Sequence, residues 1–311
     1  MKETETETYA KGAFCATFGA VLWAVSGACG QILFEAKHFD AQWLTVVRLL
    51  SAGSFMLILS LIRLKGGAFQ VWKTKRDAVE ILVYGIVGLL GIQYTYFLAI
   101  QYSNAATATV IQYLAPAMIM VYMVLRTRTA PTGREVLSMF LAVGGIFLLV
   151  THGNPGSLTL SGAALFWSVM SAVTMAIASI QPRRLLATFG TPLSNGWGML
   201  IGGLALSLFR KPWEYGQGVW DWQAVLVLLG VVVLGTILSF FFYQEGVRII
   251  GSTKASLYAT MEPLAATLIG IFFLNVAFGW IDWVGSIMIV STVFLLSLPG
   301  GSPKKNLSQS D

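Results

Sequence analysis

The chain has 311 residues, of which 56% are hydrophobic and only 11% are charged, whereas typical soluble chains are about 45–50% apolar and about 25% charged. Too few polar side chains remain to cover a water-facing surface of this size, which excludes an ordinary soluble enzyme, a disordered chain and a secreted disulfide scaffold. The net charge of +6 comes from short basic clusters between apolar runs, so it indicates membrane topology and no nucleic-acid partner.

A helix that crosses a bilayer needs about 20 largely apolar residues. Ten segments meet or approach this length, which predicts an all-α polytopic membrane protein with ten transmembrane helices. In chain order, the predicted spans are Gly12–Phe34, Ala41–Ile62, Ala78–Ile100, Ala105–Leu125, Val136–Val150, Gly162–Ile180, Ser194–Phe209, Trp222–Phe242, Ala255–Val276 and Gly279–Leu298. The fifth and seventh are short, so we expect them to cross a thinned region or to extend into their loops.

Polar segments precede and follow the spans. Residues 1–11 begin with an acidic, repetitive stretch, so we expect a disordered cytoplasmic N-terminus, and residues 299–311 are expected to form a solvated cytoplasmic tail. The start has no basic segment ahead of a short apolar core, so we expect no cleavable signal. Very short connections, such as Asn104 between the third and fourth spans, predict antiparallel helical hairpins.

The distribution of Lys and Arg predicts the orientation of the chain. If the N-terminus is cytoplasmic, 16 of the 20 basic residues lie on the cytoplasmic side, and the exceptions are Lys37, Arg210, Lys211 and the intramembrane Arg48. This excess predicts a multi-pass protein of the cytoplasmic membrane with both termini in the cytoplasm.

The sequence also repeats itself weakly. A shift of 147 positions places Tyr96 on Tyr243, Ala108 on Ala255 and Pro116 on Pro263, and a shift of 144 places Trp23 on Trp167. The shared register predicts two repeats, residues 12–151 and 159–298. Because each has five spans, an odd number, the two must insert with opposite orientations, a plan in which transporters place their site at the repeat interface.

These features resemble the EamA-type members of the drug/metabolite transporter superfamily. The residues that carry the resemblance are Trp23, Arg48 in VVRLLSAG, Tyr96 in YFLAIQYSNAA leading to Ala115-Pro116, and Tyr243 and Gly246 leading to Glu262-Pro263. The resemblance implies a transporter that moves a small organic metabolite by alternating access, with export of amino acids or related amphipathic solutes as the commoner activity. It also implies a central cavity built by the first, third, fourth, sixth and ninth spans.

Arg48 lies seven residues into the second span, roughly 10 Å from the boundary. An arginine near the bilayer centre costs about 2.5–3.5 kcal/mol, so its side chain should face protein or a water-filled cavity. One interpretation is a structural arginine that ties helices together through backbone carbonyls. The other is a guanidinium that binds a carboxylate or phosphate of the substrate.

Glu262 is the one carboxylate predicted deep within a span. It could exchange protons as the coupling ion, bind a cationic substrate, serve as a counter-ion to Arg48, or be a paired structural acid. Pro116 and Pro263 sit within predicted helices and each removes a backbone hydrogen bond, which frees the carbonyls of Gln112 and Ala259. Freed carbonyls can contact a substrate during gating; the alternative is a kink that serves packing alone.

Aromatic residues within the spans could line a substrate cavity or simply pack the core. They could contact an amphipathic or cationic solute through apolar and cation–π interactions. Together with the polar Gln112, these candidates are Trp23, Tyr94, Tyr96, Tyr113, Trp167, Trp197 and Tyr258. Further polar residues in the spans, among them Gln93 and Gln244, could bind a substrate or a neighbouring helix.

Several activities lack their sequence signatures. There is no phosphate-binding loop for ATP and no nucleophile elbow, so we expect no catalytic residues and no cofactor. The chain has only His38, His152, Cys15 and Cys29 as candidate nitrogen or sulfur ligands, which predicts no metal site.

The sequence thus predicts a secondary transporter, acting as a monomer or homodimer. The alternatives are uptake or efflux of quaternary ammonium or multidrug-type cations, and passive facilitation. An intramembrane enzyme is the least favoured class.

Overall fold

The computed structural model describes residues 2–64, 67–128, 132–152, 160–215, 218–250, 255, 258–259 and 261–297, and every regular element within them is helical. The elements are α1 (Lys2–Glu35), α2 (Ala41–Leu64), η1 (Gly67–Trp72), α3 (Lys75–Val83), η2 (Tyr84–Leu90), α4 (Gly91–Tyr102), α5 (Ala105–Gln112), α6 (Ala115–Thr127), α7 (Gly133–Thr151), α8 (Gly162–Ile180), α9 (Arg183–Phe189), α10 (Thr191–Ser207), α11 (Trp222–Leu229), η3 (Gly230–Leu238), α12 (Ser239–Ile250), α14 (Met261–Phe273) and α15 (Trp280–Ser297).

In the part of the chain that the structure describes, six helical stretches are long and apolar enough to cross a membrane. They are Glu7–Glu35, Ala41–Arg63, Lys75–Tyr102, Ala105–Arg126, Gly162–Ile180 and Trp222–Ile250. Shorter apolar helices cover Val136–Leu149, Met261–Phe273 and Trp280–Thr292. The prediction of an all-helical, polytopic membrane protein is therefore confirmed.

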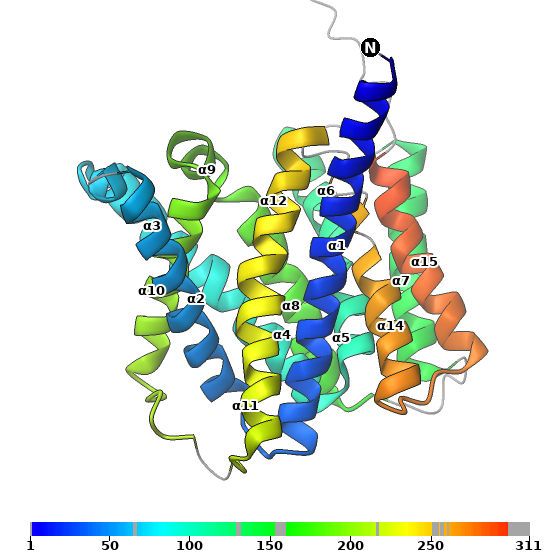
Figure 1. Ribbon diagram of the computed structural model, residues 1–311. Coiled ribbons are helices and arrows are strands. Elements are labelled where there is room, and N and C mark those ends of the chain that lie inside the picture. The colour runs from blue at the N-terminus through cyan, green and yellow to red at the C-terminus, as the bar shows by residue number, and fades with distance from the viewer. Residues whose placement is uncertain are drawn as a thin grey trace, which may run out of the picture.

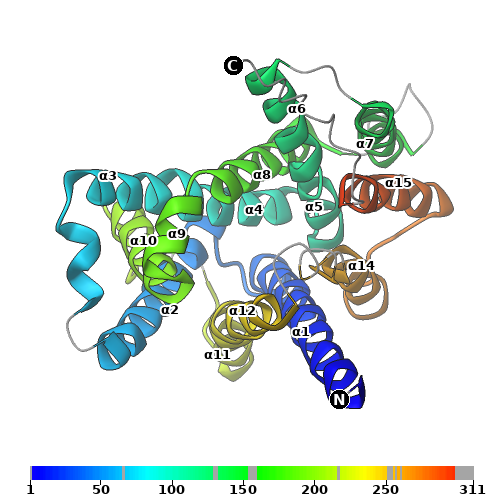
Figure 2. The same ribbon diagram turned by 90° about the horizontal axis from the view of Figure 1, so that it is seen from above.

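The helices lie side by side and run between two faces of the molecule (Figure 1). We call the face at which α1 begins and α2 ends the N-terminal face, and the one at which α1 ends and α2 begins the opposite face. The main contacts join helices that are distant in sequence: α2 packs on α10, α1 on α12, α4 on α8 and α7 on α15 (Figure 2).

The ends of several elements differ from the predictions. Residues 2–11, expected to be disordered, continue α1 as a helix, since an anchored helix extends at little cost once its nucleus has formed. The seventh predicted span starts at Thr191 and not at Ser194, because Pro192 favours the first turn of a helix. The tail at 299–311 lies outside the described residues.

Within the described residues, three interruptions break the regular helices. The π-helical segments η2 (YGIVGLL) and η3 (GVVVLGTIL) each contain two glycines and widen the helix locally. Between α5 and α6 the backbone forms a turn at Tyr113 and Leu114, and Pro116 begins the next helix. The removal of a hydrogen bond by proline is the physical reason for a break at this position.

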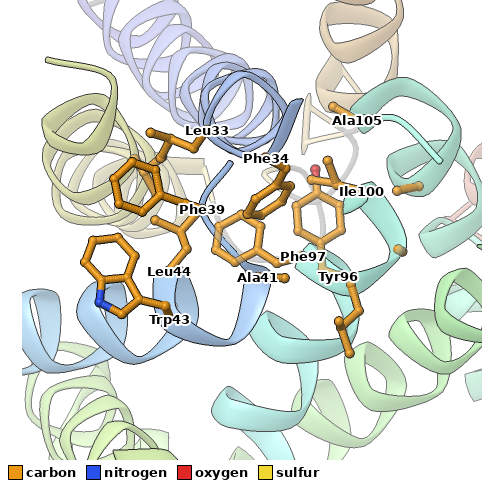
Figure 3. Packing of buried hydrophobic residues seen from close by; sticks show 14 of the residues in the cluster. Leu33, Phe34, Phe39, Ala41, Trp43, Leu44, Tyr96, Phe97, Ile100 and Ala105 are labelled. Carbon is orange, nitrogen blue, oxygen red and sulfur yellow. The ribbon is translucent and has the colours of Figure 1, made fainter. Parts of the chain in front are cut away.

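The opposite face is closed by a cluster of buried apolar side chains from α1, α2 and α4 (Figure 3). Leu33, Leu44 and Phe97 are fully buried in it. Beyond this cluster, the turn after α1 is tied to the segment before α11 by ion pairs: Lys37 Nζ lies 2.5 Å from Asp221 Oδ2, and Arg210 pairs with Asp40.

The Asp221 carboxylate of the first pair remains charged at neutral pH. The hydrogen bond from Lys37, together with that from the backbone N–H of Ala224, lowers the pKa of Asp221 from its ordinary value. Because a lowered carboxyl pKa stabilises the folded form above that pKa, the contribution is present at neutral pH and is lost as the pH falls through it. The pair should therefore persist across the physiological range.

Close packing of α2 on α10 supplies a test of the fold. A side chain at Gly53 would place its Cβ 2.6 Å from the backbone nitrogen of Leu200. Because overpacking costs about 1–3 kcal/mol, Gly53→Val should lower the midpoint of thermal unfolding in detergent by about 5 °C. Gly162→Ala is the matched control, since a Cβ at Gly162 meets nothing within 4 Å. Equal shifts for the two variants would contradict this packing.

Candidate functional site

A cavity of about 210 Å³ lies in the middle of the bundle. Its wall is built by side chains from α1, α2, η2, α4, α5, α8, α12 and α14. They are Trp23, Arg48, Leu89, Ile92, Gln93, Tyr96, Gln112, Met175, Ala178, Ser179, Phe240 and Glu262. Ser179, in the last turn of α8, is exposed, whereas the buried cluster closes the opposite face. The cavity therefore approaches the surface on the N-terminal side.

Arg48 on α2 is held by the π-helical segment η3. Its Nε donates to Thr236 Oγ1 at 2.7 Å, and its Nη2 donates to the carbonyl oxygen of Gly235 at 3.0 Å. The guanidinium carbon also lies 5.1 Å from the centroid of the Phe97 ring. Among the described residues, Nη1 has no hydrogen-bond partner. The structural role is thus present, and one edge of the guanidinium remains available to a ligand.

Glu262 on α14 reaches the cavity from the other side and is 8% exposed. Tyr113 donates a hydrogen bond through its hydroxyl to Glu262 Oε2 at 3.1 Å, and the same hydroxyl lies 2.6 Å from the carbonyl oxygen of Ala259. This is one of the two carbonyls that the proline positions predicted to be freed. Although Arg48 and Glu262 line the same cavity, the structure places no direct ion pair between these two described residues.

Aromatic rings form part of the cavity's surroundings. Trp23 packs edge-on against Phe240 at 5.3 Å and lies 5.0 Å from Tyr243. Tyr96 shares a 2.7 Å hydrogen bond with Thr109 on α5. A ligand would therefore meet two opposite charges across a space bounded by aromatic faces.

Five of the predicted site residues line this cavity: Trp23, Arg48, Tyr96, Gln112 and Glu262. Tyr113 lies behind it, where it holds Glu262. Pro263 is not one of the lining residues, and the backbone of each predicted proline, Pro116 and Pro263, lies in the first turn of its helix, α6 or α14.

The other four predicted aromatics lie elsewhere. Tyr94 accepts from Gln42 and packs edge-on against Trp167. Trp197 donates to the carbonyl of Ala68 on the N-terminal side, and Tyr258 lies 3.4 Å from the hydroxyl of Tyr9. Like the cavity aromatics, these residues lie within the predicted spans, but they project from other sides of their helices.

Six lining residues were not singled out from the sequence: Leu89, Ile92, Met175, Ala178, Ser179 and Phe240. For Phe240 the helical repeat gives no signal, because the eighth span is largely apolar and its π-helical turn rotates the residues that follow. Gln93 carried a weak signal as a polar residue within a span. Within the described part of the chain, no group of three His, Cys, Asp or Glu residues is arranged to hold a metal ion.

Comparison with known proteins gives this arrangement a context. The profile of the EamA-like transporter family matches residues 10–151 and again residues 162–298. The uncharacterised inner membrane transporter YicL of Salmonella typhimurium strain LT2 is 39% identical over 93% of this chain and 95% of its own length. The threonine/homoserine exporter RhtA of Escherichia coli K12 is 25% identical over 67% of this chain and 68% of its own length.

A solved crystal structure has the same fold. It superimposes with a TM-score of 0.57 at 17% sequence identity, covering 94% of this chain and 96% of the other. The profile match spans most of the sequence and agrees with the resemblance seen in the motifs. The chain is therefore a membrane transporter, not an enzyme, and it belongs to the EamA-like transporter family.

Proposed function

We propose that this protein is a secondary transporter that exports small zwitterionic or otherwise amphipathic metabolites by alternating access. The observation that carries the proposal is the placement of one guanidinium and one carboxylate on the same 210 Å³ cavity without an ion pair between them. A zwitterion such as an amino acid supplies the complementary pair of charges, with its carboxylate at Arg48 Nη1 and its ammonium at Glu262. That RhtA is an exporter of threonine and homoserine supports this class of cargo.

The proposal includes ten transmembrane helices in two inverted repeats, residues 12–151 and 159–298. Two observations support it. The same family profile matches each half, and the helix contacts follow a two-fold pattern, because the partners α2–α10 and α7–α15 join equivalent spans of the two halves. The π-helical segments η2 and η3 also fall at equivalent positions. This arrangement lets the halves rock about the cavity.

The direction of access follows from charge and closure. The excess of Lys and Arg in the loops of the N-terminal face favours a cytoplasmic location for it, with both termini inside. The cavity approaches that face, and the cluster around Phe97 seals the other. This conformation would accept cargo from the cytoplasm, which suits an exporter. The proposed assembly is a monomer or a homodimer, and either would leave this cytoplasmic access open.

An organic cation is the second candidate cargo. Trp23, Phe240 and Tyr243 place aromatic rings near Glu262, and such rings bind quaternary ammonium groups. Under this alternative Arg48 would be structural only. Inhibition of threonine counterflow by tetramethylammonium, with no inhibition by free carboxylates, would favour it.

Removal of the carboxylate charge should separate binding from coupling. Glu262→Gln keeps the shape and the hydrogen bond from Tyr113 but carries no charge, so threonine counterflow in proteoliposomes should fall about tenfold or more. If protons are the coupling ion, the residual transport should no longer respond to an imposed pH gradient. Gln70→Glu, at an exposed residue of η1 outside the cavity wall, is the control for altered charge. Wild-type rates in Glu262→Gln would refute this role, and wild-type transport that ignores the gradient would indicate passive facilitation.

The guanidinium can be tested through the cargo itself. Wild-type protein should prefer threonine over threoninamide by about tenfold, because the amide has no negative charge to pair with Nη1. Arg48→Gln should lose this preference, and Arg48→Lys should keep part of it, since an ammonium retains the charge without the planar fork. Competition in counterflow measures both ratios. Equal competition by acid and amide in the wild type would assign Arg48 a structural role alone.

The ion pair at the opposite face should bias the conformation. Asp221→Asn retains a side chain able to cap α11 but breaks the charge pair with Lys37, so a cysteine at Phe39 should react with an impermeant thiol reagent about two to five times faster. Lys37→Gln, which breaks the same pair and leaves the Asp221 cap on Ala224 intact, should give the same increase. Unchanged labelling in all variants would show that the apolar cluster closes this face without help.

A further inference from the structure

A second, largely apolar groove of about 410 Å³ runs beside the cavity, between α2, α10 and the segment that joins η3 to α12. Phe55, Leu59 and Phe241 line it, and Phe55 and Phe241 are 48% and 56% exposed. Because such rings face lipid in a membrane-spanning bundle, the groove opens sideways into the bilayer. It lies in the half of the molecule nearer the N-terminal face, where α2 ends.

The groove and the cavity share one wall residue. Phe240 lines both, and its ring packs against Trp23 on the cavity side. It is half-buried and is the second residue of α12, the regular helix that follows the π-helical segment, so it lies where the helical geometry changes. Rotation of this one side chain would join the two spaces.

Polar groups sit in the same groove. Arg63, in the last turn of α2, lines it and has no ion-pair partner among the described residues, and Gln244 lies one helical turn beyond Phe240. An amphipathic molecule in the adjacent leaflet would meet a cation at headgroup depth and an apolar channel below it. Another groove lies between α6, α7 and α8. It offers no comparable route to the cavity, because the two share no wall residue.

We propose that this groove is a lateral entrance for cargo with an apolar tail, with Phe240 as its movable wall. The polar head of the cargo passes from Arg63 and Gln244 to the charged cavity while its tail stays between α2 and α12. The inference rests on the proposed function for the identity of the head group, and it widens the substrate class to long-chain amphipathic zwitterions.

Two-sided labelling tests the entrance independently of any cargo. In a background with Cys15→Ala and Cys29→Ala, Phe240→Cys should react both with a bilayer-dissolved N-alkylmaleimide and with a water-soluble cationic thiosulfonate. Phe55→Cys should react about tenfold faster with the first reagent, and Gln93→Cys about tenfold faster with the second, because only access differs. Reaction of Phe240→Cys with one reagent alone, or with neither, would overturn the proposal.

A comparison of amino acids with long and short apolar tails tests whether cargo uses the lateral entrance, and it leaves Phe240 intact. Alkylation of Phe55→Cys by the N-alkylmaleimide should weaken inhibition of threonine counterflow by 2-aminodecanoate about tenfold, the worth of a few buried methylene groups. Inhibition by alanine, which has the same head group, should stay within about twofold. Phe147→Cys, an exposed site on α7, is the alkylation control.

The outcomes separate the two proposals. If alkylation of Phe55→Cys weakens inhibition by 2-aminodecanoate and by alanine equally, or weakens neither, the groove holds only lipid and the entrance is refuted. If the protein shows no threonine counterflow while Phe240→Cys is labelled from both sides, the proposed cargo fails and the lateral opening stands.

Discussion

The need to bury two charged side chains inside an apolar bundle governs the rest of this structure. A guanidinium and a carboxylate in a low-dielectric interior are tolerated only with partners. Both partners here are backbone carbonyls or hydroxyls at irregular points of helices: Gly235 and Thr236 in η3 for Arg48, and Tyr113 at the break after α5 for Glu262. Regular helices would have kept those carbonyls for their own hydrogen bonds. The irregular segments are therefore the condition for the charged cavity.

The same irregular segments suit movement. A π-helical turn or a proline break has fewer regular backbone hydrogen bonds to lose, so a helix changes its direction there at lower cost than elsewhere. Both types occur near the cavity, and each of the three described interruptions lies within a membrane-length stretch and not at its end. A rocking motion of the two proposed halves would thus bend the helices where the ligand binds, which links occupancy of the cavity to its access.

The sequence predicted the class of fold well because that class follows from length and hydropathy. It also identified Arg48 and Glu262, since an intramembrane charge is rare and costly. It separated the aromatics poorly. Trp23 lines the cavity and Trp167 does not, although the repeat places them at equivalent positions, because the side on which a residue projects depends on helix rotation and on π-helical turns. Phe240 could not be found at all, since it differs from its apolar neighbours only in where it points.

The asymmetry between the two faces argues for a conformational equilibrium that cargo can shift. The opposite face is held by buried apolar packing around Phe97 together with partly buried ion pairs near the surface, which contribute modestly each. The apolar packing contributes more to the closure than the ion pairs do. Opening that face would expose its buried apolar area to water, which costs free energy in proportion to the area. Cargo that draws Arg48 and Glu262 toward one another would pull α2 and α14, which carry these residues, into a different relative position. Since α2 supplies Leu44 to the seal, binding at the centre would act directly on the closure.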